Sequence, residues 1–422
     1  MTLATLPTGL ILGIESSCDE TAAAIVERGS AIRSNVVASQ IATHSPYGGV
    51  VPELASREHL RNIVPVVRAA VEQAGLALSS IDAIAVTSGP GLAGALMVGI
   101  SYAKALAFAL GKPLIAINHL EGHIHAVLLE QAQLAEAEDR ELPDGPVLAL
   151  VVSGGHTHLY LARHTGESWS YRNVGRTLDD AAGEAYDKVA KLLGLGYPGG
   201  PWIDALAAHG NPHAVPFAIS NIKAKAHRGG RKGITSYMAT QEQDEHLSEG
   251  STAFASGDDL QHEIPDTLFS FSGIKTAVLR YTQVHEMQAS IEHRRAVLAT
   301  MPDAKPSTAL AEVLAVCDQP TLDLIASFQR AVVDDLRRKT FRTAEALGAT
   351  TLLVSGGVAA NRELRVRFTA EAADRDLYIA FPSLALSTDN AAMIAAAAWP
   401  KFLSRDFAPE TLSADPGLAL GR

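Results

Sequence analysis

The sequence predicts an α/β protein whose two lobes repeat one order of elements, βββαβαβα. Apolar runs of strand length alternate with longer stretches of helical periodicity, a pattern typical of α/β folds. Glycine-rich turns follow several of the strand-like runs. The order of elements occurs once in each half of the chain, as in an internal duplication, although the residues themselves do not match. Two such lobes would enclose a ligand cleft between them.

The first half begins with short strands whose intervening turn residues favour an antiparallel meander. Helices and buried strands then alternate, and the last helix carries two histidines. We expect strands at residues 10–15, 21–26, 31–37, 83–87 and 113–117. We expect one helix at about 53–74, a second that ends at residue 110, and a third that includes residues 123–130.

The second half starts in the same way, with a buried strand, a tight glycine turn and two partner strands. Helices and strands again alternate to the final helix. We expect strands at residues 147–152, 157–162, 168–172, 351–354 and 377–380, and helices at 180–193, near 321–347 and at 390–399.

Two segments break the pattern of the second half. Residues 222–265 are polar and offer little apolar surface to bury, so we expect an exposed insertion there. Residues 285–320 are expected to be partly helical. We therefore expect a first lobe at residues 1–140 and a second lobe at 141–389, with the C-terminal stretch 390–422 packing back on the first lobe.

Composition restricts the class of protein. The chain has 422 residues, of which 47% are hydrophobic and 19% charged, as in a globular protein of two or more domains. We find neither a secretory signal pattern nor an apolar run that would span a membrane without polar interruption, and two cysteines make no disulfide framework. A cytoplasmic protein is expected. The net charge of −11 argues against broad non-specific binding of nucleic acid, but it permits a local basic groove.

His119 and His123 are the most informative residues of the chain. Residues four apart share one face of a helix, and Asn118 is a plausible N-cap, so both imidazoles would point at one ion near the helix start. Neutral imidazoles suit a divalent metal such as zinc or iron. The pair alone does not establish a metal site, because such a pair also occurs by chance on a half-solvated helix.

The surrounding residues argue against a zinc protease. Proteases of the His-Glu-x-x-His type place the general base directly after the first histidine. Here Leu120 occupies that place, and the carboxylate of Glu121 comes one residue later, about 100° further round a helix.

Three turns that follow strands, two of them with paired glycines, indicate where a phosphate could bind. Turns at residues 15–21 and 153–157 occupy matching places in the two halves, and a third at 355–361 precedes a helix. Glycines let backbone N–H groups approach phosphate oxygens, and helix N-termini favour anions. Each turn alone is weak, but together they favour a nucleotide cleft. The Rossmann-like pattern at 89–94 is better explained as a turn that packs a helix on a strand, since no acidic residue follows at the right distance for a ribose.

Several carboxylates lie at the starts of predicted helices. Asp180, Glu184 and Asp187 fall within about two turns, where capping and a solvated face would account for some of them. Asp389 precedes the last helix. It is either an N-cap or a third, oxygen ligand beside the two histidines, and a set of two histidines and one carboxylate leaves open positions for a substrate.

With these residues in view, the chain resembles the bacterial TsaD (Gcp) family, the tRNA N6-adenosine threonylcarbamoyltransferases, once described as O-sialoglycoprotein endopeptidases. The matching motifs run nearly from end to end. They are Gly13–Thr21, Gly49–Arg57, Asn118–His123, Val152–Thr157, Asp179–Pro201, Phe269–Thr276, Ser355–Arg362 and Ser387–Asn390.

The resemblance implies an actin/Hsp70-like (ASKHA) fold and one iron or zinc ion on His119, His123 and Asp389. It implies transfer of a threonylcarbamoyl group from threonylcarbamoyl-adenylate to N6 of the adenosine 3′ of the anticodon in tRNAs that read ANN codons, with release of AMP. Glu15 would face the reacting end. The residues that would hold the donor are Val151, Val152, Ser153, Gly154, Gly155, Asp187, Gly200, Asp204 and Asn361.

The physical chemistry suits this reaction. A mixed anhydride has a good leaving group, so no protein nucleophile is required, and a metal can polarise the carbonyl. We hypothesise that Glu15 relays the proton of the attacking amine.

The resemblance also implies partners. Relatives work with a degenerate paralogue, TsaB, and an ATPase, TsaE, and the apolar stretch 94–110 is a candidate partner surface. The chain departs from the family at 222–265, where the basic run 223–232 is either a tRNA phosphate contact or a solvated loop. The alternatives are a metal-dependent glycopeptidase, an ATPase or chaperone of the same fold, and a non-catalytic scaffold.

Overall fold

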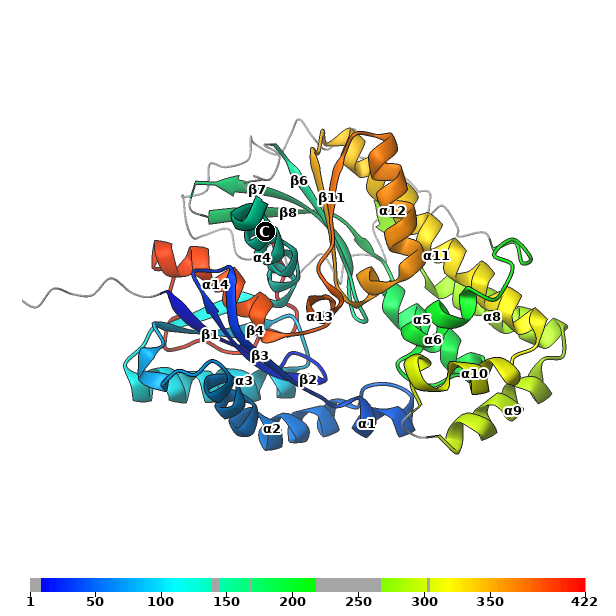
Figure 1. Cartoon of the computed structure of the whole chain (residues 1–422), viewed down its shortest axis with the longest axis horizontal. Helices are drawn as coiled ribbons and strands as arrows, with labels where there is room; N and C mark the ends of the chain where they lie inside the picture. The colour runs from blue at the N-terminus through cyan, green and yellow to red at the C-terminus, as the bar shows by residue number, and fades with distance from the viewer. Residues whose placement is uncertain (1–8, 139–144, 167, 218–266, 302–303, 422) are drawn as a thin grey trace, which may run out of the picture.

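The computed structural model describes residues 9–138, 145–166, 168–217, 267–301 and 304–421. The expected insertion at 222–265, with its basic run, lies outside these residues. The described chain forms two mixed sheets, each with helices on both faces (Figure 1).

The first sheet has the order β3-β2-β1-β4-β5. Its first three strands form the expected antiparallel meander, and β4 and β5 add to it in parallel. The strands are β1 (Leu10–Glu15), β2 (Glu20–Glu27), β3 (Ala31–Ser39), β4 (Ala83–Gly89) and β5 (Leu114–Asn118).

The second sheet repeats this order as β11-β10-β6-β7-β8, with a two-residue strand, β9, added at the edge. Its meander is again antiparallel, and β10 and β11 are again parallel to the strand beside them. The expected duplicated α/β fold, the element order of the actin/Hsp70-like class, is therefore confirmed. The strands are β6 (Val147–Val152), β7 (Thr157–Thr165), β8 (Ser168–Thr177), β9 (Leu268–Phe269), β10 (Thr351–Ser355) and β11 (Tyr378–Ala380).

Alternation of side chains along the strands supplies both faces of each sheet with apolar residues. On β1, Leu10, Leu12 and Ile14 pack toward α2 (Pro52–Gln73) and α3 (Ala93–Leu110). Ile11 packs on the other side, toward α14 (Ala391–Ser404).

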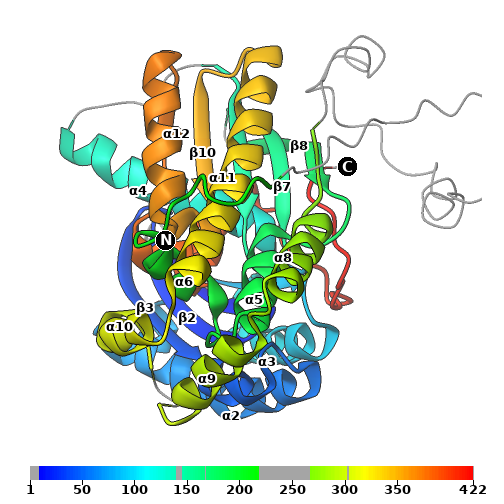
Figure 2. The same ribbon diagram turned by 90° about the vertical axis from the view of Figure 1, so that its right-hand side faces the viewer.

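In the second sheet, alternate residues of β6 pack toward α4 (His119–Glu138), and the others pack toward a larger group of helices. Figure 2 shows two of that group, α11 and α12, running over β10. These helices are α5 (Ala182–Leu192), α6 (Gly199–Ala207), α8 (Ser272–Val284), α9 (Gln288–Ala299), α10 (Pro306–Ala315), α11 (Gln319–Ala346) and α12 (Arg362–Asp374).

The last helix of each repeat packs on the sheet of the other repeat. Helix α4 follows β5 of the first sheet, yet Leu120, Ile124 and Val127 pack on the second. Helix α14 follows β11 of the second sheet and packs on the first. The two helices also contact each other between the sheets, where Ala126 and Leu129 of α4 join the α14 cluster. This exchange brings the starts of α4 and α14 together.

Two helix boundaries differ from the sequence expectation. The helix expected at 180–193 begins at Ala182. Asp180 stays outside it because its carbonyl oxygen accepts a hydrogen bond from the Thr177 hydroxyl and its carboxylate accepts one from Lys188. The segment at 285–320 is partly helical, as expected, and holds α9 and α10. Helix α14 continues to Ser404 and ends at Arg405, which has left-handed backbone geometry.

Length and composition alone would allow α3 to cross a membrane, although Ser101 and Lys104 interrupt its apolar run. In the fold, however, Leu96, Ile100 and Ala103 bury one face of this helix against the first sheet. The glycines at its start serve close packing, as expected. A side chain on Gly91 would lie 2.6 Å from the Ser17 carbonyl oxygen, and one on Gly94 would meet the Ser56 hydroxyl.

Candidate metal centre

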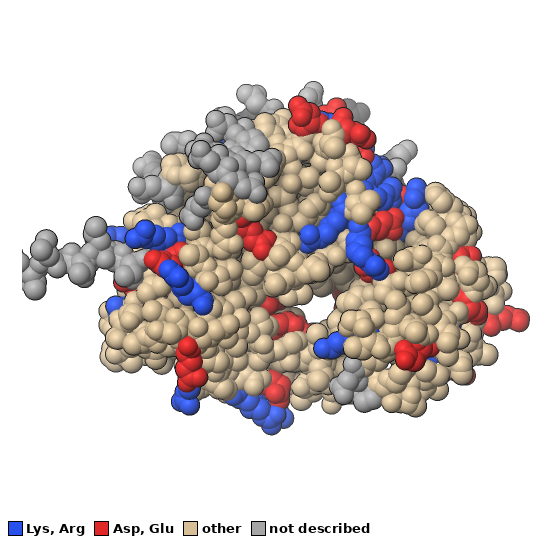
Figure 3. Space-filling model, in the orientation of Figure 1, with Lys and Arg blue, Asp and Glu red and all other residues tan. Residues whose placement is uncertain are grey.

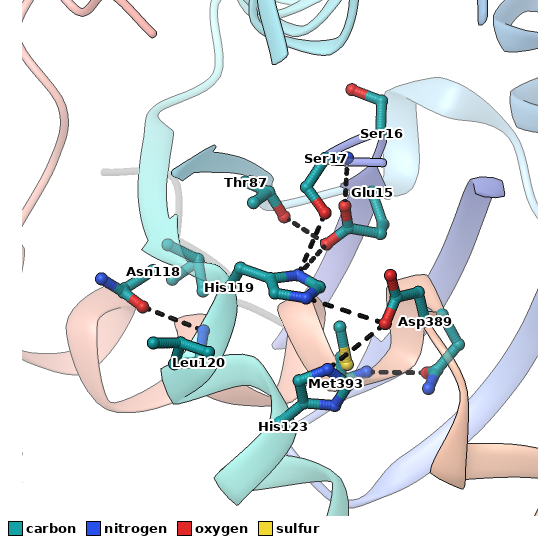
Figure 4. A network of polar contacts seen from close by, with 12 residues as sticks. Glu15, Ser16, Ser17, Thr87, Asn118, His119, Leu120, His123, Asp389 and Met393 are labelled. Carbon is teal, nitrogen blue, oxygen red and sulfur yellow. Dashed lines mark hydrogen bonds and ion pairs between the residues drawn. The ribbon is translucent and has the colours of Figure 1, made fainter. Parts of the chain in front are cut away.

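The starts of α4 and α14 place three expected ligands in one cluster (Figure 4). Asp389 Oδ1 lies 3.2 Å from His123 Nε2 and 3.7 Å from His119 Nε2. The three ligand atoms all lie within 4.8 Å of one another, and this is the one such group found among the described residues. The side chains of His119 and His123 are buried, whereas Asp389 is 18% exposed. The spacing and burial are those of a site for one divalent ion.

His123 shows that the cluster is not satisfied by the protein alone. Its ring is fully buried, and Nδ1 has no hydrogen-bond partner within the described part of the chain, while Nε2 makes no hydrogen bond of good geometry there and faces only Asp389 Oδ1 at 3.2 Å. A buried polar group left without a partner costs about 1–3 kcal/mol. A cation on Nε2 would remove part of that cost, so the donor set fits a metal ion.

The charges of the cluster depend on one another. Burial would raise the pKa of Asp389, but His119, His123 and His156 together outweigh it and hold that pKa below its usual range. Burial would lower the pKa of His119, but Asp389 and Glu15 together raise it to about 9. A metal ion must therefore displace a proton from His119 at neutral pH.

Glu15 lies on the far side of His119 from Asp389. Its carboxylate is fully buried, and Oε2 is 3.1 Å from His119 Nδ1 and 2.6 Å from the Thr87 hydroxyl. The backbone N–H of Ser17 donates to Oε1. Burial would raise the pKa of Glu15, but the nearby His119 outweighs it and the pKa is lowered. The sequence indicated the turn that holds Glu15, but it did not show that the carboxylate of Glu15 contacts Nδ1 of His119, one of the expected metal ligands.

His156 was not singled out by the sequence. It ends the turn between β6 and β7, and its ring centroid lies 6.0 Å from that of His119. Burial, with smaller effects from His119 and His158, lowers its pKa to about 3, so the imidazole is neutral. The signal that could have found it is positional, because this turn occupies the same place in the second repeat as the Glu15 turn does in the first.

Glu121, the carboxylate that a protease would need, contacts the end of α14 that lies away from Asp389. Its Oε2 lies 3.6 Å from Lys401 Nζ, near the end of that helix, whereas Asp389 precedes the helix start. The protease geometry is thus absent from this cluster.

The residues expected to hold the donor fall beside the cluster. Val151 and Val152 are buried in β6, and Ser153 begins the turn that ends at His156. A side chain on Gly183 would lie 2.8 Å from Gly154 Cα, so α5 packs directly on this turn. Side chains added at Gly154, Gly155 and Gly200 would meet nothing within 4 Å, so these backbones face open space that a ligand can enter.

Three polar side chains expected near the donor are anchored by the protein. Asp187 accepts a hydrogen bond from Gly199 N–H at 2.7 Å, and burial, opposed by the Gly199 and Gly200 N–H groups, raises its pKa to about 6. Asp204 pairs with Arg362 at 2.9 Å. Asn361 caps α12 through Leu364 N–H, a structural role that uses its carbonyl oxygen.

These anchored groups come from α5, α6 and the start of α12. Helix α5 packs on α6, and Arg362 at the start of α12 pairs with Asp204 of α6. Figure 3 shows an opening in the molecular surface between these helices and the first lobe. The turn at 153–156 belongs to both groups of residues, since Gly154 faces open space and His156 adjoins the metal cluster.

Comparisons with known proteins agree on one family. A family model described as "TsaD: tRNA N6-adenosine threonylcarbamoyltransferase" matches residues 31–396. A protein of that name from Koribacter versatilis is 60% identical over 97% of this chain and 99% of its own length. Another, from Moorella thermoacetica, is 45% identical over 97% of each.

Among solved structures, (R)-2-hydroxyglutaryl-CoA dehydratase component A from Acidaminococcus fermentans aligns over 93% of this chain and 98% of its own. Its TM-score is 0.43 at 11% identity, too distant to bear on activity.

Proposed function

Because the chain belongs to the TsaD family of tRNA N6-adenosine threonylcarbamoyltransferases, we propose that the cluster of His119, His123 and Asp389 is the metal centre of that activity. The enzyme transfers a threonylcarbamoyl group to N6 of an adenosine in tRNA. The observation that carries the proposal is the convergence of these side chains, from two helices that exchange sheets, around a buried imidazole that makes no hydrogen bond among the described residues and whose Nε2 faces Asp389 Oδ1 at 3.2 Å.

The proposed donor is threonylcarbamoyl-adenylate, and the proposed acceptor is the adenosine 3′ of the anticodon in tRNAs that read ANN codons. The N6 amine attacks the carbamoyl carbon of the mixed anhydride, the bond to the phosphate oxygen breaks, and AMP leaves with the electron pair. This chemistry needs no protein nucleophile. The protein has to hold the donor, orient the amine and accept one proton.

An iron or zinc ion on this donor set would supply Lewis-acid polarisation of the carbonyl and hold the donor's threonyl carboxylate. A set of two imidazoles and one carboxylate leaves open positions for such a ligand, and it suits either metal. Asp389 is the most exposed of the three side chains, so the open positions face the cleft.

The donor's adenylate is proposed to lie along the turn at 153–155 and the start of α6. Open backbone at Gly154, Gly155 and Gly200 suits close approach of a phosphate or a ribose. Asp187 and Asp204 offer carboxylate oxygens that could accept from ribose hydroxyls, and both are already held in place by protein contacts. The glycines bring the donor near, and the carboxylates orient it.

We propose that a TsaB-like paralogue docks on the outer faces of α2 and α3 and that a TsaE-like ATPase completes the assembly. Leu60 and Val64 of α2 are exposed, and so are Met97 and Phe108 of the adjoining α3, with Phe108 91% exposed. Apolar side chains gathered on neighbouring helices mark protein contact surfaces. We place the reaction in the cytoplasm, with its tRNA acceptor.

The proposal is tested by mass analysis of nucleosides from reactions with threonylcarbamoyl-adenylate and the two partners. One tRNA reads an ANN codon, and its control differs only in the first codon base that it reads. Threonylcarbamoyl-adenosine in the first tRNA alone is expected. Equal product in both tRNAs would contradict the proposal that the enzyme acts on tRNAs that read ANN codons. No product in either would remove the proposed donor.

A further inference from the structure

We propose that Glu15 is a positioning residue for the metal centre. Its carboxylate fixes the tautomer and the orientation of His119, so that Nε2 of that imidazole points to the metal. The inference rests on the proposed metal centre and assigns to Glu15 a role other than proton relay.

The sheet itself brings the participants together. Strands β1, β4 and β5 are neighbours and parallel, with Ile14 paired to Val86 and Thr87 paired to Ile117. The carboxyl ends of parallel neighbours meet at one edge of a sheet. Glu15 ends β1, Thr87 lies near the end of β4, and β5 leads directly into His119. Strand pairing thus places all three side chains at one edge.

The hydrogen bonds determine which nitrogen of His119 carries a proton. An ionised carboxylate only accepts hydrogen bonds, so the imidazole nitrogen 3.1 Å from Glu15 Oε2 must donate. That nitrogen is Nδ1. When a metal displaces the other proton, the lone pair that it meets is on Nε2, the atom nearer to Asp389. Metal-bound histidines usually show this arrangement, with the other ring N–H held by a carboxylate or carbonyl.

Glu15 is itself held in place. Thr87 donates to Oε2 at 2.6 Å, and the Ser17 backbone N–H donates to Oε1. The residue is completely buried. A carboxylate so restrained cannot rotate away from His119 without losing several hydrogen bonds.

The same geometry argues against proton relay. The imidazole ring of His119 separates Glu15 from the Nε2 side, where Asp389 lies and the donor would bind (Figure 4). Both carboxylate oxygens already accept from protein donors. Glu15 would therefore act on the reaction only through His119.

The test measures metal affinity separately from turnover. Purified full-length wild type, Glu15→Gln and Thr87→Val are titrated with Zn²⁺ against a chromophoric chelator. We expect Glu15→Gln to weaken binding roughly 10- to 100-fold, as for other outer-shell partners of metal ligands, and transfer to recover when the metal is saturating. Thr87→Val removes one hydrogen bond to the carboxylate, and we expect binding to weaken about two- to tenfold.

Glu121→Gln is the matched control, because Glu121 is a buried carboxylate on α4 that pairs with Lys401 and not with the cluster. Its Zn²⁺ affinity should equal that of the wild type. Unchanged affinity in Glu15→Gln, with slower transfer at saturating metal, would overturn the inference and restore the proton relay. If Glu15→Gln does not fold, unchanged affinity in Thr87→Val overturns it instead. Wild-type affinity that survives His119→Ala would overturn the metal centre itself, a separate failure.

Discussion

At the residue scale, the buried ring of His123 is a polar group that the metal-free protein leaves without a hydrogen bond among the described residues. Neither of its nitrogens makes a hydrogen bond in the described structure, although Nε2 faces Asp389, and His119 carries a proton whose pKa of about 9 a metal must overcome. Metal binding therefore removes a cost of folding as well as building a site. A ligand that binds the folded state alone stabilises it by mass action.

Removal of the metal should accordingly lower the melting temperature. At a free Zn²⁺ concentration roughly a hundred times Kd, the expected stabilisation is about 3 kcal/mol. Differential scanning fluorimetry of chelator-treated protein, before and after Zn²⁺ is restored, measures the effect. His123→Ala should show no response to Zn²⁺, and a response equal to that of the wild type would contradict the assignment of this ligand.

Asp187 gives a prediction about pH. Burial raises its pKa to about 6 in the folded protein, so between about pH 4 and 6 the folded state binds more protons than the unfolded state. Stability from this residue is thus present at low pH and is lost as pH rises through 6.

Asp187→Asn keeps an oxygen for Gly199 N–H and removes the buried charge. We expect the variant to be more stable than the wild type at pH 7.5, by on the order of 1–3 kcal/mol, and equal to it at pH 4. Urea unfolding at both pH values measures the difference. A variant less stable at pH 7.5 would show that the ionised carboxylate makes interactions that the buried charge does not outweigh.

Residue patterns predicted part of this site. Helical spacing paired His119 with His123, and the place of Asp389 before a helix made it a candidate ligand. Spacing could not show that Glu15 would meet Nδ1 of His119, since that contact depends on the pairing of three strands. Nor did it show His156, whose position depends on how the two sheets face each other.

At the scale of elements, the exchange of α4 and α14 between the sheets determines the site. Gly13 of β1 is where α14 approaches most closely. A side chain there would meet the Ala391 carbonyl and lie 2.8 Å from Ala395 N, both backbone atoms that cannot turn aside. Gly122 of α4 also faces α14, but a side chain there would meet the flexible tip of Ile394 at 2.8 Å.

These two glycines make a matched pair of variants. Gly13→Ala should lower the free energy of unfolding by about 1–3 kcal/mol, because it forces α14 away from the sheet. It should also weaken Zn²⁺ binding, because Asp389 precedes that helix. Gly122→Ala should cost far less, because Ile394 can move. Urea unfolding and Zn²⁺ titration compare them, and equal effects would contradict the argument from helix packing.

Sequence periodicity predicted most strands and helices to within a few residues, because each depends on its own pattern of apolar side chains. Sequence periodicity did not predict which of the two sheets each helix would cover. Helix α4 buries Leu120 and Ile124 on one side and Ala126 on the other, so it packs on the second sheet and on α14 together. When a helix has apolar residues on two faces, its sequence does not indicate which face will pack on which neighbour.

At the scale of the whole molecule, the two lobes divide the work. We propose that the first half of the chain supplies the histidines and, on the exposed apolar faces of α2 and α3, the partner surface, and that the second half supplies the glycine turn and the carboxylates for the donor. In this proposal partner binding and chemistry use different surfaces, so a substitution on one surface should leave the other unchanged.

Met97→Asp should abolish binding of the TsaB-like partner and leave the melting temperature within about 1 °C of the wild type, because the side chain is 59% exposed. Val366→Asp on α12 is the control, since that side chain is 68% exposed on the second lobe. Isothermal titration calorimetry with the partner compares them. Undiminished binding by Met97→Asp would move the interface away from α3.

The most direct test of the whole account is reconstitution of transfer activity from metal-free enzyme. Chelator-treated wild type and Asp389→Asn are each supplied with threonylcarbamoyl-adenylate, tRNA, both partners and increasing Zn²⁺ or Fe²⁺, and modified adenosine is measured in a single turnover. The account predicts that activity in the wild type returns and saturates at one equivalent of metal, while Asp389→Asn stays inactive at that stoichiometry. Full activity of the metal-free wild type, or equal recovery of the variant, would contradict a catalytic metal on His119, His123 and Asp389.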